Sequence, residues 1–166
     1  MELYLFRHGA AEDRGPDGRD ASRRLTDEGQ SEVRRALALG ANGRMSPGLV
    51  LSSPYVRAVE TARVAADALG YRGQILTSAA LEPDSSPSDV WSEIRAHSGE
   101  SSILVVGHEP LLSETAAWLL GSTRVIVEFP KAALARIDFE NLGPTPAGVL
   151  RWLVTPDLRP STPDAG

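Results

Sequence analysis

Arginine and histidine side chains suited to phosphoryl chemistry lie at separate points of this chain. Arg7 and His8 are adjacent near the N-terminus, Arg57 follows much later, and His108 later still. Arginine stays cationic at any working pH, and its planar group can bind two oxygens of one anion. An unprotonated imidazole is a nucleophile. These residue types favour phosphoryl transfer, which is catalysed mainly by positioning the reactants and by stabilising charge on the transferred group.

The candidate residues follow short apolar runs that are long enough to form strands. These runs are residues 3–6, 48–51 and 102–106, and the last is a continuous β-branched and leucine run that is typical of a buried strand. Ligands of open α/β folds lie at the carboxyl ends of the strands. If the three strands are parallel neighbours, both arginines and both histidines converge on one pocket.

Two expected helix starts add backbone donors to this pocket. Ser53 as N-cap and Pro54 at the first helical position predict a helix that begins just before Arg57. Pro110 marks the first turn of another helix, where we expect the backbone N–H of Glu109 to bind an anion. The sequence therefore predicts a phosphate site that contains a nucleophile.

Each candidate residue also has a purely structural interpretation. Arg7 could be a cation on a pocket rim, Arg57 a solvated helix residue, and His8 and His108 ordinary buried imidazoles. Their joint placement at strand ends favours the site. His97 keeps the structural interpretation, because it lies in the last turn of an expected helix, where an imidazole complements the helix dipole.

Strand-like and helix-like segments alternate along most of the chain. Helices are expected from Thr26 to about Gly40, from Ser53 to Gly70, from Ser86 onward with Asp89 as a capping carboxylate, and from Pro110 to Gly121. Further strands are expected at residues 74–77, 125–129, 132–139 and 149–154. This order predicts an α/β fold, a three-layer sandwich whose mostly parallel central sheet carries helices on both faces and includes hairpin-like pairing near its end.

Length and composition restrict the class of protein. A chain of 166 residues favours one domain, expected over residues 1–156, and the Pro- and Ser-containing residues 157–166 predict a flexible tail. The net charge of −5 and a pI near 5.2 argue against general binding to nucleic acid or to an anionic membrane. No run is apolar over the length that a membrane span needs, and the N-terminus lacks a secretory signal, so we expect a cytoplasmic protein.

Thiol chemistry and metal binding are not expected. The chain contains no cysteine, which excludes disulfides and cysteine nucleophiles. Its histidines, His8, His97 and His108, lack the i,i+4 or short-loop spacing of zinc ligands. We therefore expect no metal and no cofactor.

Four segments of the sequence resemble motifs of the histidine phosphatase superfamily, also called the phosphoglycerate mutase-like family. They are Leu5-Phe6-Arg7-His8-Gly9, Leu25-Thr26-Asp27-Glu28-Gly29, Ser52-Ser53-Pro54-Tyr55-Val56-Arg57-Ala58-Val59-Glu60-Thr61-Ala62 and Val105-Val106-Gly107-His108-Glu109-Pro110. They occur in the family's order and cover nearly the whole chain except the tail. The small size, Asp20-Ala21-Ser22-Arg23-Arg24-Leu25-Thr26 and Lys131-Ala132-Ala133-Leu134-Ala135 are most similar to the bacterial phosphohistidine phosphatase branch.

The resemblance implies a role for each candidate residue. His8 would be the nucleophile and would be phosphorylated transiently, while Arg7, Arg57 and His108 would bind the phosphoryl oxygens. The attacking nitrogen of His8 must be unprotonated, so its other N–H needs an acceptor, expected in the backbone near Gly9. No metal is required, because the arginines and His108 would supply the positive charge.

The general acid is the least defined part of the predicted site. Glu82 and Asp84 lie in about the region where mutases of this family place a glutamate, but their register differs and both could be loop carboxylates. The Ser-Glu-Trp-Asn segment of the mutases is also missing, and residues 10–13 read Ala-Ala-Glu-Asp instead. A phosphoramidate substrate fits this departure, since a protonatable imidazole leaving group depends less on a protein acid.

The sequence therefore predicts a metal-independent phosphatase that acts through a phosphohistidine intermediate at His8, with protein phosphohistidine as its substrate. A small-molecule or sugar phosphate monoester phosphatase is the alternative, favoured if Glu82 points into the pocket. A non-catalytic module that binds phosphoproteins is a third interpretation, but binding alone would not need a nucleophile. The loop of residues 10–24 follows the first strand and could form the rim of the pocket.

Overall fold

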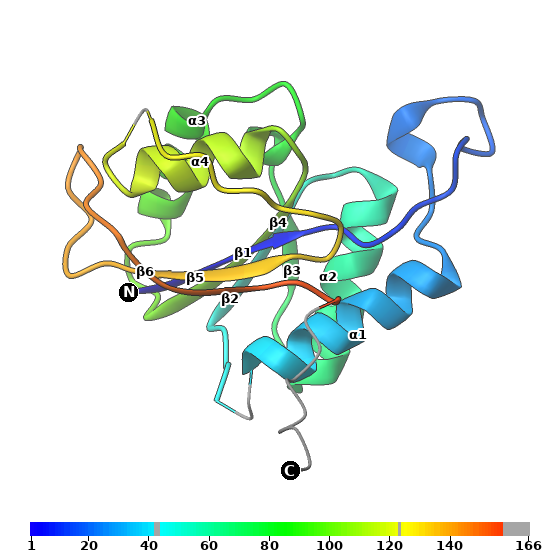
Figure 1. Cartoon of the computed structure of the whole chain (residues 1–166), viewed down its shortest axis with the longest axis horizontal. Coiled ribbons are helices and arrows are strands. Elements are labelled where there is room, and N and C mark those ends of the chain that lie inside the picture. Colours follow the sequence, from blue (N-terminus) through cyan, green and yellow to red (C-terminus); the bar gives the residue numbers. More distant parts are fainter. Residues whose placement is uncertain (42–43, 123, 158–166) are drawn as a thin grey trace, which may run out of the picture.

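A mixed sheet of six strands forms the centre of the computed structural model, which describes residues 1–41, 44–122 and 124–157 (Figure 1). The strands are β1 (Glu2–Arg7), β2 (Leu49–Ser52), β3 (Ile75–Thr77), β4 (Ser102–Gly107), β5 (Leu134–Asp138) and β6 (Val149–Val154), in the spatial order β3-β2-β4-β1-β5-β6. The first four run parallel, whereas β5 is antiparallel to both of its neighbours. Most of the expected tail, residues 158–166, lies outside the described residues.

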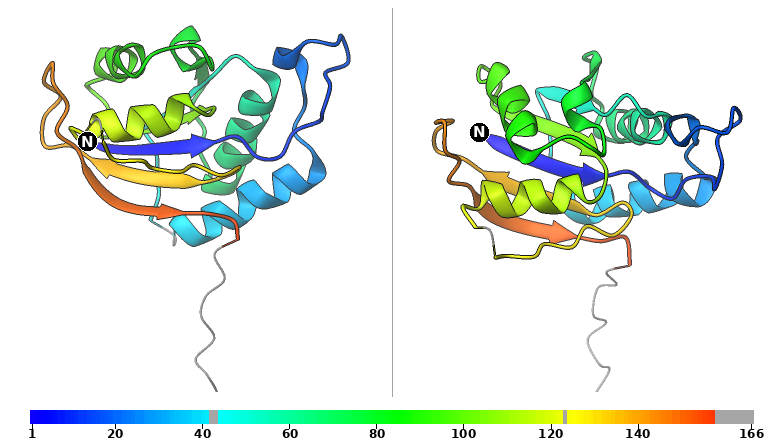
Figure 2. Two further views of the ribbon diagram at one scale, coloured as in Figure 1. Left: turned by 45° about the horizontal axis from the view of Figure 1, so that its top comes forward. Right: turned by 90° about the horizontal axis from the view of Figure 1, so that it is seen from above.

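Two helices cover each face of the sheet (Figure 1 and Figure 2). The helices α1 (Asp27–Ala41) and α2 (Val56–Leu69) lie on one face, and α3 (Pro87–Ala96) and α4 (Leu111–Leu119) lie on the other. The predicted three-layer α/β fold with a mostly parallel sheet is confirmed. None of the described helices is long and apolar enough to cross a membrane.

Side chains of β1 alternate between two hydrophobic cores. Leu3 and Leu5 pack with α3 and α4, while Tyr4 and Phe6 pack with α1 and α2, and all four are buried. Burial stabilises the strand by about 25 cal/mol for each Å² of apolar surface removed from water. A shift of one residue would exchange the two faces, so packing fixes the register and with it the residues that follow the strand.

The register of the parallel strands decides which polar residues meet at the carboxyl edge of the sheet. Arg7 of β1 is paired with Gly107 of β4. The His8 N–H continues this ladder by donating to the Gly107 carbonyl at 3.1 Å. On the other side of β4, the Ser53 N–H is bound to the strand in the same way, at 2.9 Å. His108, the residue that follows β4, therefore has neighbours from two strands.

Local capping explains most of the helix boundaries. Ser86 and Asp89 form the predicted capping box of α3. The Thr26 hydroxyl accepts a backbone N–H of the first turn of α1 at 3.0 Å, as predicted for its cap. The starts of α2 and α4 have no side-chain cap, and α2 begins at Val56 rather than beside Ser53.

Residues 125–129, which were predicted to be a strand, form none in the structure. β1 and β6 occupy both edges of β5, the strand that follows, so the segment has no partner nearby. Val125 and Ile126 are 46% and 86% exposed, whereas Phe129 is buried. The β-branched residues of this segment therefore belong to an exposed surface and not to the sheet.

Candidate active site

The alternation of side chains along β1 continues to its end and separates Arg7 from His8. Arg7 lies on the side of α4, and its Nη1 group donates to the Phe129 carbonyl at 2.6 Å. His8 lies on the side of α2, where the Arg57 side chain contacts it. One strand thus places a cation on one side of the carboxyl edge and an imidazole on the other.

Hydrogen bonds define the protonation of the His8 ring. Nδ1 lies 2.7 Å from the Gly9 carbonyl oxygen, which can only accept, so Nδ1 carries the proton. Nε2 therefore has the lone pair, and the Arg57 Nε–H donates to it at 3.2 Å. The expected backbone acceptor near Gly9 is confirmed, and the ring presents an unprotonated nitrogen to Arg57.

Gly9 is required by a close approach of two chain segments. A Cβ on Gly9 would lie 2.5 Å from the carbonyl oxygen of Gly29 in α1, and a Cβ on Gly29 would lie 2.1 Å from the Ala10 carbonyl oxygen. The two glycines therefore let the turn after β1 pack against the first turn of α1. The Gly9 N–H also donates to the Thr61 hydroxyl of α2, at 3.3 Å, which anchors the same turn to the second helix.

His108 joins the site from the neighbouring strand, β4. Its Nε2 lies 2.7 Å from the Ser53 hydroxyl, and its ring centroid is 5.1 Å from that of His8 and 5.0 Å from that of Tyr55. The Ser53 hydroxyl thus belongs to the site. Among the described residues, the only backbone N–H that donates to it is that of Tyr55, at 3.3 Å. The predicted N-cap role of Ser53 is wrong for this reason, and α2 begins later, at Val56.

Both imidazoles are neutral near pH 7. Burial lowers the pKa of His8 to about 4, opposed by the hydrogen bond to Gly9 and reinforced by the charges of Arg57 and Arg7. Burial also lowers the pKa of His108 to about 3, with His8 and Arg57 as further causes. Without a bound anion, the positive charge of the site therefore comes from its arginines, and a charge on His108 beside a phosphoryl group stays a prediction.

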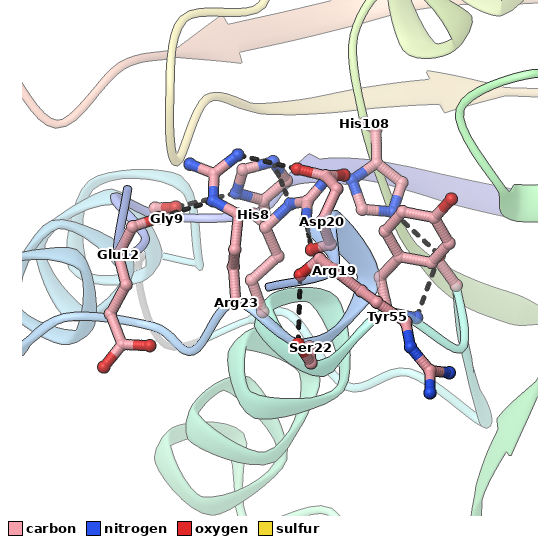
Figure 3. A network of polar contacts seen from close by, with 11 residues as sticks. His8, Gly9, Glu12, Arg19, Asp20, Ser22, Arg23, Tyr55 and His108 are labelled. Carbon is pink, nitrogen blue, oxygen red and sulfur yellow. Dashed lines mark hydrogen bonds and ion pairs between the residues drawn. The ribbon is translucent and has the colours of Figure 1, made fainter. Parts of the chain in front are cut away.

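Asp20 is a site residue that the sequence did not single out. The Arg57 Nη1 group donates to the Asp20 carbonyl at 2.7 Å, and Nη2 donates to its carboxylate at 2.9 Å. Arg23 binds the other carboxylate oxygen at 2.8 Å (Figure 3). Hydrogen bonds from Arg23 and then Arg57 lower the pKa of Asp20, so it is an anion at neutral pH. The only sequence feature that pointed to Asp20 was the segment of residues 20–26, whose resemblance indicated the branch of the family.

All three donor nitrogens of Arg57 therefore have protein acceptors. Nε is bound to His8, and the two terminal groups are bound to Asp20. A phosphoryl group that binds this guanidinium must displace or share the Asp20 carboxylate, which is 54% exposed. The short helix that carries it, η1 (Asp20–Ser22), has no buried residue. The predicted position of the loop of residues 10–24 at the rim of the site is confirmed.

Two buried nitrogens at the site lack a hydrogen-bond partner among the described residues. They are Nε of Arg7 and Nδ1 of His108, and the third such side-chain atom is the Thr115 hydroxyl in α4. A buried polar group without a partner is costly and uncommon. A phosphoryl oxygen bound beside the His8 ring would be an acceptor for the Nε–H of Arg7, and for Nδ1 of His108 in the tautomer whose Nε2 accepts from the Ser53 hydroxyl.

The predicted acids lie near Tyr55, at the rim of the site. Glu82 follows η2 (Ala79–Leu81) and is half-buried, whereas Asp84 is exposed. Burial raises the pKa of Tyr55, and the charges of Glu82 and Asp84 raise it further, which places both carboxylates nearby. In the described part of the chain neither forms a hydrogen bond with a site imidazole. Their role as proton donors stays a prediction.

Glu109 lies beside Arg7 with its carboxylate held in place. It accepts a hydrogen bond from the Ser113 backbone N–H at 3.2 Å and another from the Ser113 hydroxyl. Burial raises the pKa of Glu109, whereas these hydrogen bonds and the charge of Arg7 lower it. Anion binding by the Glu109 backbone N–H stays a prediction, since no hydrogen bond tests it.

The donor set of the site suits an anion. Within residues 1–41, 44–122 and 124–157, no group of three or more His, Cys, Asp or Glu side chains is placed to hold a metal ion. The site instead combines two guanidinium groups with two neutral imidazoles. The Asp20 carboxylate is paired with Arg57, and the Glu109 carboxylate lies beside Arg7. Guanidinium groups bind oxyanions through charge-assisted hydrogen bonds.

The part of the chain that holds three of the four predicted site residues matches a known family. Residues 3–82 match the model of the histidine phosphatase superfamily (branch 1). A protein of Picosynechococcus sp. (strain ATCC 27264 / PCC 7002 / PR-6), described only as uncharacterized, is 34% identical over 137 residues. The alignment covers 81% of this chain and 82% of that protein.

Solved structures that resemble this one include a protein histidine phosphatase and a putative phosphohistidine phosphatase. The protein histidine phosphatase SixA, complexed with tungstate, is 26% identical with a TM-score of 0.82, over 94% of this chain and 97% of that one. The putative phosphohistidine phosphatase SixA of Agrobacterium tumefaciens is 25% identical with a TM-score of 0.79, over 93% and 97%. A putative alpha-ribazole-5'-P phosphatase of Escherichia coli str. K-12 substr. MG1655 shares the fold, at 20% identity and a TM-score of 0.67, over 94% and 98%.

The low pKa of His8 predicts a loss of stability in acid. The unfolded chain takes up a proton on His8 below the ordinary pKa of 6.5, whereas the folded chain does so only near about 4. The free energy of unfolding should therefore fall as the pH drops through this window, by up to roughly 3 kcal/mol for this group. Urea unfolding above and within the window measures the loss. Residue 8 of the His8→Gln variant cannot titrate, so this variant should lose less unfolding free energy over the same pH range. An equal loss in both proteins would contradict the low pKa of His8.

Asp20→Asn is expected to tighten the binding of inorganic phosphate. The substitution removes a negative charge that competes with the anion for Arg57 and keeps the backbone contact. Because the carboxylate is about half exposed, the gain should be modest, about two- to fivefold in Kd by titration calorimetry. Asp17→Asn removes the same charge from the same loop, away from Arg57, and is the matched control. Weaker binding by Asp20→Asn would mean that Asp20 holds Arg57 in position for the anion.

Proposed function

Since the chain belongs to the histidine phosphatase superfamily, and is therefore a phosphatase, we propose that it acts on protein phosphohistidine and that His8 is phosphorylated during turnover. The observation that carries this proposal is the unprotonated Nε2 of His8, set by the 2.7 Å contact between Nδ1 and the Gly9 carbonyl. A nucleophile needs that lone pair, whereas a site that only binds phosphate does not.

In the first step, Nε2 of His8 attacks the phosphorus of the substrate. The new P–N bond forms as the P–N bond of the phosphohistidine breaks, and the electron pair of the broken bond leaves with the substrate imidazole. That ring departs as a neutral imidazole when its other nitrogen already carries a proton, so the protein need not donate one. The positive charge that His8 gains is shared with the Gly9 carbonyl through the Nδ1–H.

In the second step, water attacks the phosphorus of phosphorylated His8. The P–N electron pair returns to Nε2, both protons of the water remain on the released phosphate, which leaves as dihydrogen phosphate, and the ring regains its starting tautomer. In the transition state of each step, negative charge is spread over the equatorial phosphoryl oxygens. Hydrogen-bond donors aimed at those oxygens therefore accelerate both steps.

Arg7, Arg57 and His108 are the donors that we assign to the phosphoryl oxygens. The buried Nε of Arg7 and Nδ1 of His108 have no other partner among the described residues. The Nε of Arg57 lies 3.2 Å from the attacking nitrogen and donates to it, so this N–H passes from Nε2 to a phosphoryl oxygen when the substrate binds and leaves the lone pair available for attack. The related SixA structure was solved with tungstate, an oxyanion like phosphate, which supports an anion in this site.

Leaving-group chemistry favours a phosphoramidate over a monoester. An alkoxide needs a proton in order to leave, whereas a protonated imidazole does not. Among the described residues no protonated carboxyl group contacts the site imidazoles, since Asp20 is held as an anion and Glu82 lies near Tyr55. Similarity to structures described as a protein histidine phosphatase and a putative phosphohistidine phosphatase supports the same substrate.

A phosphate monoester phosphatase is the second candidate function. Glu82 is half-buried near Tyr55, and the Tyr55 ring packs against that of His108. A rotation of the Glu82 side chain toward the pocket would bring a carboxyl group to the leaving group of a small ester. A module that only binds phosphoproteins is disfavoured, because it would not need the lone pair on His8.

His8→Ala should abolish turnover, because it removes the nucleophile, while the arginines still bind inorganic phosphate. Rapid quenching of wild-type protein with a labelled phosphohistidine substrate should trap an acid-labile label, and peptide mapping should locate it on His8. His97→Ala, at the C-terminal end of α3, is the matched control and should keep the wild-type rate. Hydrolysis by His8→Ala at that rate would rule out covalent catalysis at this residue.

A panel of substrates separates the two candidate activities. The kcat/KM for a phosphohistidine peptide should exceed that for phosphoserine and sugar phosphates by about a hundredfold or more, which is the usual contribution of a missing general acid. The rates are measured as phosphate release under identical conditions. Faster hydrolysis of the monoesters, lost in Glu82→Gln, would establish the second candidate function instead.

A further inference from the structure

An open groove adjoins the candidate active site on the side of the sheet that α4 covers. It has a volume of about 420 Å³ and is lined by Arg7, Glu109, Ser113 and residues 126–130. Residues 126–130 form one wall, and this segment runs to the carboxyl end of β1 before the chain turns into β5 (Figure 1). The groove therefore begins at the phosphate-binding edge of the sheet.

Phe129 connects this groove to the predicted phosphate-binding residues. Its carbonyl accepts the hydrogen bond from Arg7 Nη1 at 2.6 Å, and its side chain is buried in the core shared with α3 and α4. The wall of the groove and the Arg7 guanidinium are thus held as one unit. A substrate whose phosphoryl group lies on Arg7 and His8 would place its neighbouring residues along this wall.

The wall exposes apolar side chains to solvent. Ile126 is 86% exposed, and Val125, the residue before it, is 46% exposed. Val127 and Pro130 continue the apolar lining. An exposed apolar surface beside an active site marks a place where a partner can bury it.

Two carboxylates give the groove a negative character. Glu109 and Glu128 both line it, and neither forms a salt bridge with another described residue. Among the described residues that line the groove, Arg7 is the only cation, and the proposed function assigns it to the phosphoryl group. A cationic side chain next to an apolar one is therefore complementary to the groove once the phosphoryl group is bound.

We propose that this groove docks the segment of the phosphoprotein substrate that adjoins its phosphohistidine, with an apolar side chain on Ile126 and a Lys or Arg side chain on Glu128. The inference rests on the proposed function, which places the phosphoryl group on Arg7 and His8. It assigns the choice of substrate sequence to the connection between α4 and β5, outside the catalytic residues. A small ester has no adjoining residues and gains nothing from the groove.

Two synthetic peptides with one phosphohistidine each test the docking surface. One carries Leu and Lys beside the phosphohistidine, the other carries Leu and Glu, and free phosphohistidine is the reference substrate. Wild-type protein should hydrolyse the Lys peptide with a kcat/KM about five- to tenfold above that of the Glu peptide. Glu128→Lys should reverse this preference. Ile126→Ser should lower kcat/KM for both peptides about tenfold relative to free phosphohistidine.

Matched variants near the amino end of β1 separate local from global effects. Glu140→Lys makes the same change of charge, and Leu150→Ser removes another exposed apolar side chain, one that is 40% exposed. Both should keep the wild-type preference. A preference that is unchanged in Glu128→Lys, or changed equally in Glu140→Lys, would overturn the docking proposal and leave the phosphatase in place. If wild-type protein hydrolyses no phosphohistidine substrate, the proposed function fails, and the docking proposal fails with it.

Discussion

The hydrogen bond from His8 Nδ1 to the Gly9 carbonyl is the interaction on which the rest of the site depends. It selects the tautomer in which Nε2 keeps its lone pair, on a ring that burial already holds neutral. The segment that makes this bond follows β1 and packs against α1 at a distance where no Cβ fits on Gly9 or Gly29. The chemistry of one nitrogen thus rests on how a strand packs against a helix.

Charge within the site is balanced by the protein itself. Two guanidinium groups near two buried rings disfavour a further proton on either ring, which keeps the nucleophile unprotonated. The same guanidinium groups need anions, and Asp20 supplies one to Arg57 while Glu109 lies close to Arg7. Asp20 is on a surface loop and half exposed, so its ion pair is weak, whereas a phosphoryl dianion brings more charge and more acceptor atoms. An anion site held in this way is organised before a substrate arrives.

Local patterns predicted the order of the elements, the capping box of α3 and the strand ends that carry the site, because hydrophobic periodicity and caps are properties of neighbouring residues. Two local signals were overridden by tertiary contacts. Ser53 has the residue type of an N-cap, but its hydroxyl binds His108 instead. Residues 125–129 have the composition of a strand, but no strand edge is available beside β5, and their surface stays exposed.

The order of amino acids was enough to name Arg7, His8, Arg57 and His108 and to place each of them after an apolar run, since residue types and spacing are written in the chain. It was not enough to say which nitrogen of His8 is unprotonated, that the His108 ring is neutral, or that the Asp20 carboxylate is hydrogen-bonded to Arg57. Those properties depend on burial and on distances between residues that are far apart in sequence. They arise only when the folded sheet brings its strand ends, and the loop that covers them, to one place.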